Sequence, residues 1–141
     1  MNKKAESFQK YLSDNKITKV FAVEELHDTW DTVLFRSRLD IHGNYLPTVI
    51  IFDKTVYGII RVVVVPQAVS EANELEILRF AAAANKHYKA FKYYFDDNGA
   101  LILDVTLVGK DSDGDMVYAM LDTLIEHLSV FYKEIMQVVW R

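Results

Sequence analysis

The spacing of apolar residues along this chain changes from helical to strand-like and back in a fixed order, which restricts the folds that the chain can adopt. Apolar residues recur every three or four positions over residues 3–15, over residues 71–88 and from Met116 onward, as they do on one face of a helix. Elsewhere apolar and polar residues alternate, as in half-buried strands. The sequence therefore predicts a short helix, four strands, a long helix, a hairpin and a long C-terminal helix.

The first four strands are expected at residues 20–26, 33–41, 45–52 and 56–65. Residues 33–41 alternate most clearly, because apolar side chains occupy one face and Arg36 and Arg38 lie on the other. Pro47 lacks the amide hydrogen that a strand donates to its neighbour. We therefore expect that end of the third strand to lie at a sheet edge or at a bulge. Asp97-Asn98-Gly99 predicts the turn of the later hairpin.

The fourth strand, residues 56–65, is apolar on both faces. A strand of this kind is covered on both sides in folded proteins. If helices cover only one face of the sheet, the surplus indicates a central strand, a second covering layer or a dimer surface. The sequence leaves these interpretations open, and Val62 and Val64 are the residues that we expect at a partner or dimer surface.

The second helix carries more apolar residues than contact with one sheet requires. Its apolar row consists of Ala72, Leu75, Leu78 and Ala82, flanked by Ile77, Phe80, Ala81 and Ala84. We expect Ile77, Phe80 and Ala84 to contribute to a partner or dimer surface. Trp30 and Trp140 are further candidates for partner contacts, because they are the aromatic residues whose burial within a single domain is least assured.

Length and charge exclude several classes of protein. A chain of 141 residues, 51% of them hydrophobic, builds one core and is too short for two, so we expect a single domain over residues 1–141. A net charge of -4 argues against a nucleic-acid partner. The absence of cysteine excludes disulfides and fits a reducing compartment. No secretion signal is visible, and no apolar run approaches the roughly 20 residues of a membrane helix. We expect a cytoplasmic protein without a membrane partner.

No catalytic or phosphate-binding motif is present among the serines and glycines. Asp111, Asp113 and Asp115 resemble the start of a calcium loop, but the glycine and the last ligand are misplaced, and capping of the last helix is the better interpretation. The four histidines lie in separate segments without metal-ligand spacing, and we expect them in loops or on the surface. The sequence therefore predicts no catalytic residue, no cofactor and no metal.

Three arginines could form an anion site. Arg36, Arg38 and Arg61 can share the polar face of the sheet, and guanidinium groups bind carboxylates through two hydrogen bonds. Pairing of these arginines with acidic side chains on neighbouring strands is the alternative, and it is the one we favour.

Three segments carry a resemblance to a known family: LPTVIIF at residues 46–52, NKHY at residues 85–88 and FKYYFDDNG at residues 91–99. They resemble the YbjN family of bacterial proteins, which are described as sensory transduction regulators. The resemblance implies an antiparallel sheet with helices packed on it, similar in fold to the type III secretion chaperones, and a homodimer. The family carries no accepted catalytic residues, so the resemblance implies none here.

These observations predict an α+β domain with an antiparallel sheet of about five to six strands, in the order α-ββββ-α-ββ-α. The predicted function is a noncatalytic, chaperone-like or regulatory interaction module that binds an unknown polypeptide partner as a homodimer. The alternative is a sensor of a small anionic ligand, or an enzyme of unrecognised type, with a pocket between helices and sheet.

Overall fold

The computed structural model describes residues 1–109 and 113–140. Its elements are α1 (Lys3–Asp14), β1 (Ala22–Glu25), β2 (Val33–Ile41), β3 (Asn44–Phe52), β4 (Tyr57–Val65), α2 (Glu74–His87), β5 (Phe91–Phe95), β6 (Leu101–Val108) and α3 (Gly114–Val139). A short 3-10 turn, Thr18–Val20, precedes β1. The order α-ββββ-α-ββ-α is the predicted one, and it confirms the α+β fold class.

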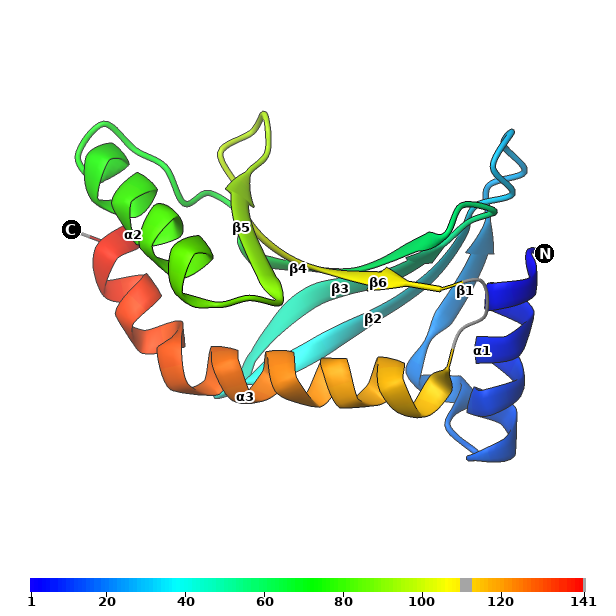
Figure 1. Ribbon diagram of the computed structural model, residues 1–141. Helices are drawn as coiled ribbons and strands as arrows, with labels where there is room; N and C mark the ends of the chain where they lie inside the picture. The colour runs from blue at the N-terminus through cyan, green and yellow to red at the C-terminus, as the bar shows by residue number, and fades with distance from the viewer. Residues whose placement is uncertain (110–112, 141) are drawn as a thin grey trace.

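The six strands form one antiparallel sheet in the order β1-β2-β3-β4-β6-β5 (Figure 1). Tight turns join β2 to β3 and β3 to β4, whereas the connection through α2 places β5 at the far edge and β6 beside β4. The prediction that residues 56–65 form a central strand is therefore confirmed. At the opposite edge, β1 pairs only with residues 33–36 of β2. The rest of β2 has no strand on that side within the described chain.

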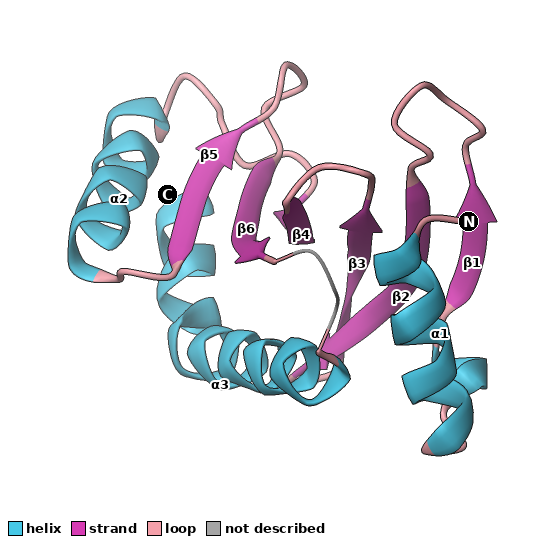
Figure 2. Ribbon diagram, turned by 45° about the vertical axis from the view of Figure 1, so that its right-hand side comes forward, coloured by secondary structure: helices cyan, strands magenta, loops and turns pink. Residues whose placement is uncertain are grey.

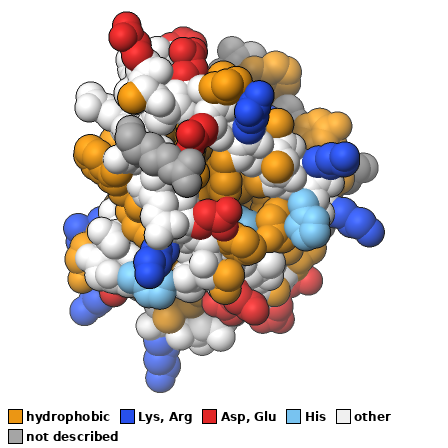
Figure 3. Space-filling view, turned by 90° about the vertical axis from the view of Figure 1, so that its left-hand side faces the viewer, with side chains coloured by type: hydrophobic (Ala, Val, Ile, Leu, Met, Phe, Trp, Pro, Cys, Tyr) orange, Lys and Arg blue, Asp and Glu red, His pale blue; other side chains and the backbone are white. Residues whose placement is uncertain are grey.

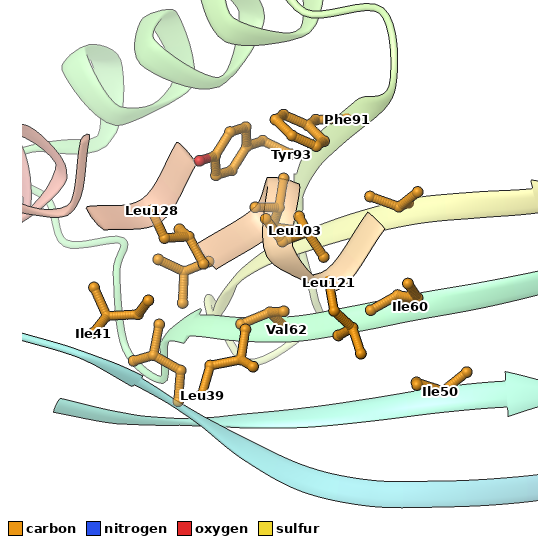
Figure 4. Close-up of a cluster of buried hydrophobic side chains, with 14 of the residues drawn as sticks. Leu39, Ile41, Ile50, Ile60, Val62, Phe91, Tyr93, Leu103, Leu121 and Leu128 are labelled. Carbon is orange, nitrogen blue, oxygen red and sulfur yellow. The ribbon is translucent and has the colours of Figure 1, made fainter. Parts of the chain in front are cut away.

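All three helices pack on one face of the sheet (Figures 1 and 2). α3 runs along this face, α1 lies at the end near β1 and β2, and α2 lies beside β5. The strand residues that face the helices join the buried residues of all three helices in one core. Figure 4 shows Leu121 and Leu128 of α3 pointing toward Val62, Ile60 and Leu103 of the sheet.

Two buried polar side chains fix α1 to the sheet. Asn2 caps the first turn of α1, and its Nδ2 donates to the carbonyl of Phe52 at 3.0 Å. Lys4 Nζ donates to the carbonyls of Thr55, at 2.7 Å, and Tyr57, at 2.6 Å. Burial lowers the pKa of Lys4 from its ordinary value. These contacts give hydrogen bonds to carbonyls at the end of β3 and the start of β4, which would otherwise be buried without a partner.

Asn73 connects the start of α2 to the end of α3. Its Oδ1 accepts from the amide of Ser70 at 2.8 Å, and its Nδ2 donates to the carbonyls of Ala68, at 2.7 Å, and Val139, at 2.8 Å. Asn73 is almost completely buried. Because these bonds satisfy both ends of the amide, they set the position at which α2 begins.

The orientation of α2 differs from the orientation that its sequence indicates. Ile77, Ala81 and Ala84 face the core, whereas Leu75 and Leu78 are 60% and 46% exposed. The predicted apolar row therefore faces water.

Asn85 explains part of the rotation of α2. It donates from Nδ2 to the carbonyl of Tyr93 at 2.9 Å and accepts from the amide of Tyr93 at 2.6 Å. These two bonds occupy the free edge of β5 much as another strand would. The face of α2 that carries Asn85 is thus held against the sheet.

α3 begins at a capped end. The side chain of Asp113 accepts from the amides of Asp115, at 3.0 Å, and Met116, at 3.4 Å, which confirms the capping interpretation for this residue. Asp111 lies outside the described residues. Gly114 packs directly against the ring of Tyr11, and a Cβ at this position would overlap that ring. α1 and α3 therefore approach each other at a point where only glycine fits.

Candidate functional site

The face of the sheet opposite the helices is covered by no described helix or strand (Figure 1). We call this surface the open face. Its apolar members include Leu34, Val49, Ile51, Ile59, Val63, Ile102 and Val108. A sheet with one solvated face ordinarily carries polar side chains there. The open face therefore presents more apolar surface than contact with water explains.

The register of the strands places these residues in rows across the sheet. Leu34, Ile51 and Ile59 are direct cross-strand neighbours on β2, β3 and β4. Ile102 of β6 lies between Val63 of β4 and Tyr94 of β5 in a second row. Leu34 and Ile102 are buried by their neighbours alone, since neither belongs to the core beneath the helices. Ile51, Ile59 and Val63 remain half-exposed.

A charged row lies between the two apolar rows. Arg61 of β4 and Asp104 of β6 are cross-strand partners, and Arg61 Nε and Nη2 donate to the two carboxylate oxygens at 2.9 Å and 3.0 Å. Asp104 is 3% exposed. The hydrogen bonds to Asp104 raise the pKa of Arg61. Pairing with an acidic neighbour, the interpretation that we favoured from the sequence, is thus confirmed for Arg61.

Arg36 and Arg38 line a shallow groove of about 520 Å³. The groove lies beside the first residue of β1, where β2 continues without a strand partner on that side. The Nε of Arg36 lies 3.7 Å from a carboxylate oxygen of Glu24, and both side chains are exposed. The guanidinium carbon of Arg38 lies 5.2 Å from the centre of the Tyr45 ring. Lys19 adds a third cation to the groove. All three predicted arginines therefore lie on the open face, but only Arg36 and Arg38 line the groove. Arg61 lies two strands from Arg36 in the same row, across Val49, and is paired with Asp104.

The structure corrects four of the predicted partner-surface residues. Val62, Val64, Ile77 and Ala84 are buried in the core of the single chain, with Val62 and Ile77 at 0% exposure. The side chains of Val62 and Val64 are on the helix-covered side of β4. Alternation along a strand places their neighbours, such as Val63, on the open face. The exposed apolar surface of β4 is thus formed by the alternate residues, such as Val63, and not by Val62 and Val64.

The other three predicted partner-surface residues are accessible to solvent. Phe80 is half-buried at the α2 surface, with its ring 5.4 Å from that of Tyr93. Trp30 is 57% exposed in the loop between β1 and β2, and Trp140 is 77% exposed at the end of α3. No described contact brings the two tryptophans to the open face or to each other.

His127 was expected in a loop or on the surface, and the structure corrects this expectation. It lies on α3, 8% exposed, with Nε2 2.7 Å from the hydroxyl of Tyr93. The rings of Tyr88, Phe91 and Phe131 lie 4.7, 4.6 and 4.9 Å from the imidazole. Burial lowers the pKa of His127 to about 4 and raises the pKa of Tyr93. Both side chains are therefore uncharged at neutral pH.

Signals for two of the missed residues are present in the sequence. Asp104 is a lone charge within an apolar strand, which requires a cationic partner on an adjacent strand. His127 lies at helical spacing from Leu124 and next to Leu128, on the stripe that faces the sheet. Its position on that stripe indicates burial better than its residue type does.

Within the described residues, no group of three or more histidine or acidic side chains is arranged to hold a metal ion. The described helices also include none with the length and hydropathy needed to cross a membrane. No family model matches the chain, and a search of curated proteins finds no match. The resemblance to the YbjN family therefore stays a prediction.

Proposed function

We propose that this protein is a noncatalytic interaction module that forms a homodimer and binds a polypeptide partner, and that the open face is the contact surface. The observation that carries the proposal is the apolar surplus on the uncovered face, with Ile51, Ile59 and Val63 at its centre. The resemblance to the YbjN family and to the type III secretion chaperones favours the same function.

The arrangement of the open face suits protein contact. Dimer interfaces combine an apolar centre with polar groups that fix the orientation of the partner. Burial of apolar surface contributes about 25 cal/mol per Å², so two facing sheets of branched side chains stabilise a complex substantially. The Arg61–Asp104 pair is already satisfied within one chain, and it can be covered without leaving an unpaired buried charge.

Replacing Ile59 with aspartate is expected to convert the dimer into a monomer. Ile59 faces away from the core, so the charge is tolerated in a free subunit, whereas in an apolar interface it is desolvated without a partner. Central interface residues contribute about 2 kcal/mol or more, which corresponds to a rise of roughly thirty-fold in the dimer dissociation constant. Sedimentation equilibrium over a range of concentrations measures this constant, and circular dichroism verifies folding.

Val130→Asp is the matched control. Val130 is an exposed apolar residue of α3, on the covered side of the sheet, and its replacement should leave the dissociation constant unchanged. A wild-type chain that remains monomeric at every concentration, or an I59D variant that assembles as well as V130D, would exclude the open face as the dimer surface.

The groove at Arg36 and Arg38 favours a second function, the binding of an anionic ligand. Lys19, Arg36 and Arg38 supply three cations, against one carboxylate in the lining, that of Asp40, and one beside Arg36, that of Glu24. The stacking of Arg38 on Tyr45 holds one guanidinium in place. Guanidinium groups bind carboxylates and phosphates in planar, two-bonded geometry. A ligand with two or more negative charges fits this set of donors.

Citrate or inorganic phosphate is expected to raise the melting temperature of the wild-type protein but not that of an Arg38→Gln variant. A ligand that binds only the folded state, at about ten times its dissociation constant, stabilises the fold by about 1.4 kcal/mol, or a shift of about 4 °C. Arg79→Gln, which removes an exposed arginine of α2, serves as the control. Equal shifts in all three proteins would indicate a general salt effect and would eliminate the groove as a site.

A further inference from the structure

A recess of about 190 Å³ lies between α2 and α3, far from the open face. We call it the aromatic recess. Five ring-bearing side chains line it, together with two alanines of α2 and one carboxylate. The rings and the carboxylate belong to Phe80, His87, Tyr88, His127, Phe131 and Glu134. Figure 3 looks onto this side of the molecule, where hydrophobic side chains gather beside acidic and histidine side chains.

The rings of the recess meet at angles. Tyr88 is nearly perpendicular to His127, at 78°, and inclined to Phe131 by 69°, with ring centres 4.7 Å and 5.8 Å apart. The rings of His127 and Phe131 are 4.9 Å apart. A π-face carries partial negative charge and attracts a cation placed over it.

The charges around the recess favour the same kind of occupant. Among the described residues that line it, none is lysine or arginine, and the carboxylate of Glu134 is the single acidic group. The bonding of His127 to Tyr93 and its burial keep the imidazole neutral, so it does not repel a cation. Among the described residues that line the recess, an anion would meet the carboxylate of Glu134 and no lysine or arginine.

We propose that the aromatic recess binds the head group of an organic cation, either a quaternary ammonium or a guanidinium. Several π-faces and one carboxylate are the groups that recognise such head groups in proteins. The cation could belong to a free small molecule or to an arginine or methylated lysine side chain of a polypeptide, and the chemistry of the site is the same for both. This site is separate from the open face and does not depend on the proposed dimer.

Choline and its neutral isostere 3,3-dimethylbutan-1-ol test the proposal, because they have the same shape and differ in charge. We expect choline to shift the aromatic NMR signals of Tyr88, His127 and Phe131 in a saturable manner. Its affinity should exceed that of the isostere about three- to thirty-fold, the range that cation-π attraction supplies. Equal or tighter binding of the isostere, or no saturation up to about 100 mM choline, would overturn the proposal.

Two substitutions on α3 sharpen the test. Glu134→Gln removes the carboxylate and should weaken choline binding several-fold without changing the affinity for the isostere. Glu126→Gln removes an exposed carboxylate of the same helix that does not line the recess, and it should leave both affinities unchanged. Equal weakening of choline binding by both substitutions would indicate a general charge effect and would contradict the site.

N-acetyl-arginine amide distinguishes the two kinds of head group. Tighter binding of this compound than of choline assigns the recess to a guanidinium, as in an arginine side chain of a partner. The reverse order assigns it to a quaternary ammonium, and a trimethyl-lysine peptide compared with choline then separates a polypeptide source from a free small molecule. The Ile59→Asp variant should bind either compound as the wild type does. Failure of the dimer proposal and failure of the cation proposal therefore give different results.

Discussion

Replacing Phe8 with alanine is expected to lower the free energy of unfolding by about 4 kcal/mol. Phe8 is completely buried, and its ring centre lies 5.0 Å from that of Phe35 and 5.6 Å from that of Phe52 on the sheet. It also meets Phe21 at 5.7 Å. Removal of this ring leaves a cavity between α1 and the sheet, because the surrounding rings belong to separate elements and cannot all move inward.

The loss should be large because α1 depends on this contact. The helix has 12 residues, and helices of that length are marginal in water without packing. Urea unfolding followed by circular dichroism measures the change, with Phe8→Leu as the control that retains an apolar side chain and costs about 1.5 kcal/mol or less. A loss below about 1 kcal/mol for Phe8→Ala would show that α1 does not pack through this ring.

The order of elements could be predicted because it rests on local patterns. The hairpin turn at Asp97-Asn98-Gly99 and the alternation over β2 each act within a few residues. Pro47 shows that a local pattern can also be correct within an interior strand. Although β3 lies between β2 and β4, pairing with β4 begins only at Thr48. Pro47 therefore lies at a local edge, as its missing amide hydrogen requires.

The sequence indicates the faces of β4 through one residue only. Ile59, Val62, Val63 and Val64 are all apolar, and Arg61, which shares a face with Ile59 and Val63, is the one polar side chain that marks the face turned away from the helices. The choice depends on pairing with β3 and β6, which are set by contacts far apart in the chain. A bulge between Val63 and Val65 also interrupts the alternation at the end of the strand.

The candidate site was predictable only in part, for the same reason. The pairing of Arg61 with an acidic neighbour follows from the alternation of charge along a strand, but the identity of Asp104 depends on the position of β6 beside β4. The proximity of Arg36 and Arg38 follows from their spacing on one strand. Arg61 lies apart from them because β3 separates β4 from β2, and its guanidinium is paired with Asp104.

Stability is expected to fall between about pH 6.5 and about pH 4 because of His127. The unfolded chain binds a proton on this histidine below its ordinary pKa of 6.5, whereas burial lowers the pKa of the folded state to about 4. The contribution of the neutral imidazole is therefore complete above pH 6.5 and is lost as the pH falls through the pKa of the folded state. Because one side of the ring borders the aromatic recess, we expect about 2 kcal/mol, less than the full linkage.

A His127→Gln variant isolates this contribution from that of the carboxylates, which titrate in the same range in both proteins. Glutamine can still accept a hydrogen bond from Tyr93, whose raised pKa keeps its hydroxyl protonated, and it does not titrate. The other rings that face His127 are those of Tyr88, Phe91 of β5 and Phe131 of α3. The ionisable side chains of His87 and Glu134 line the recess beside it and are the same in both proteins. Urea unfolding at about pH 7.5 and about pH 4.5 should show a smaller loss for the variant than for the wild type. Equal losses would mean that the imidazole is solvated in the folded protein. His127 would then be protonated at acid pH and would place a positive charge in the lining of the aromatic recess.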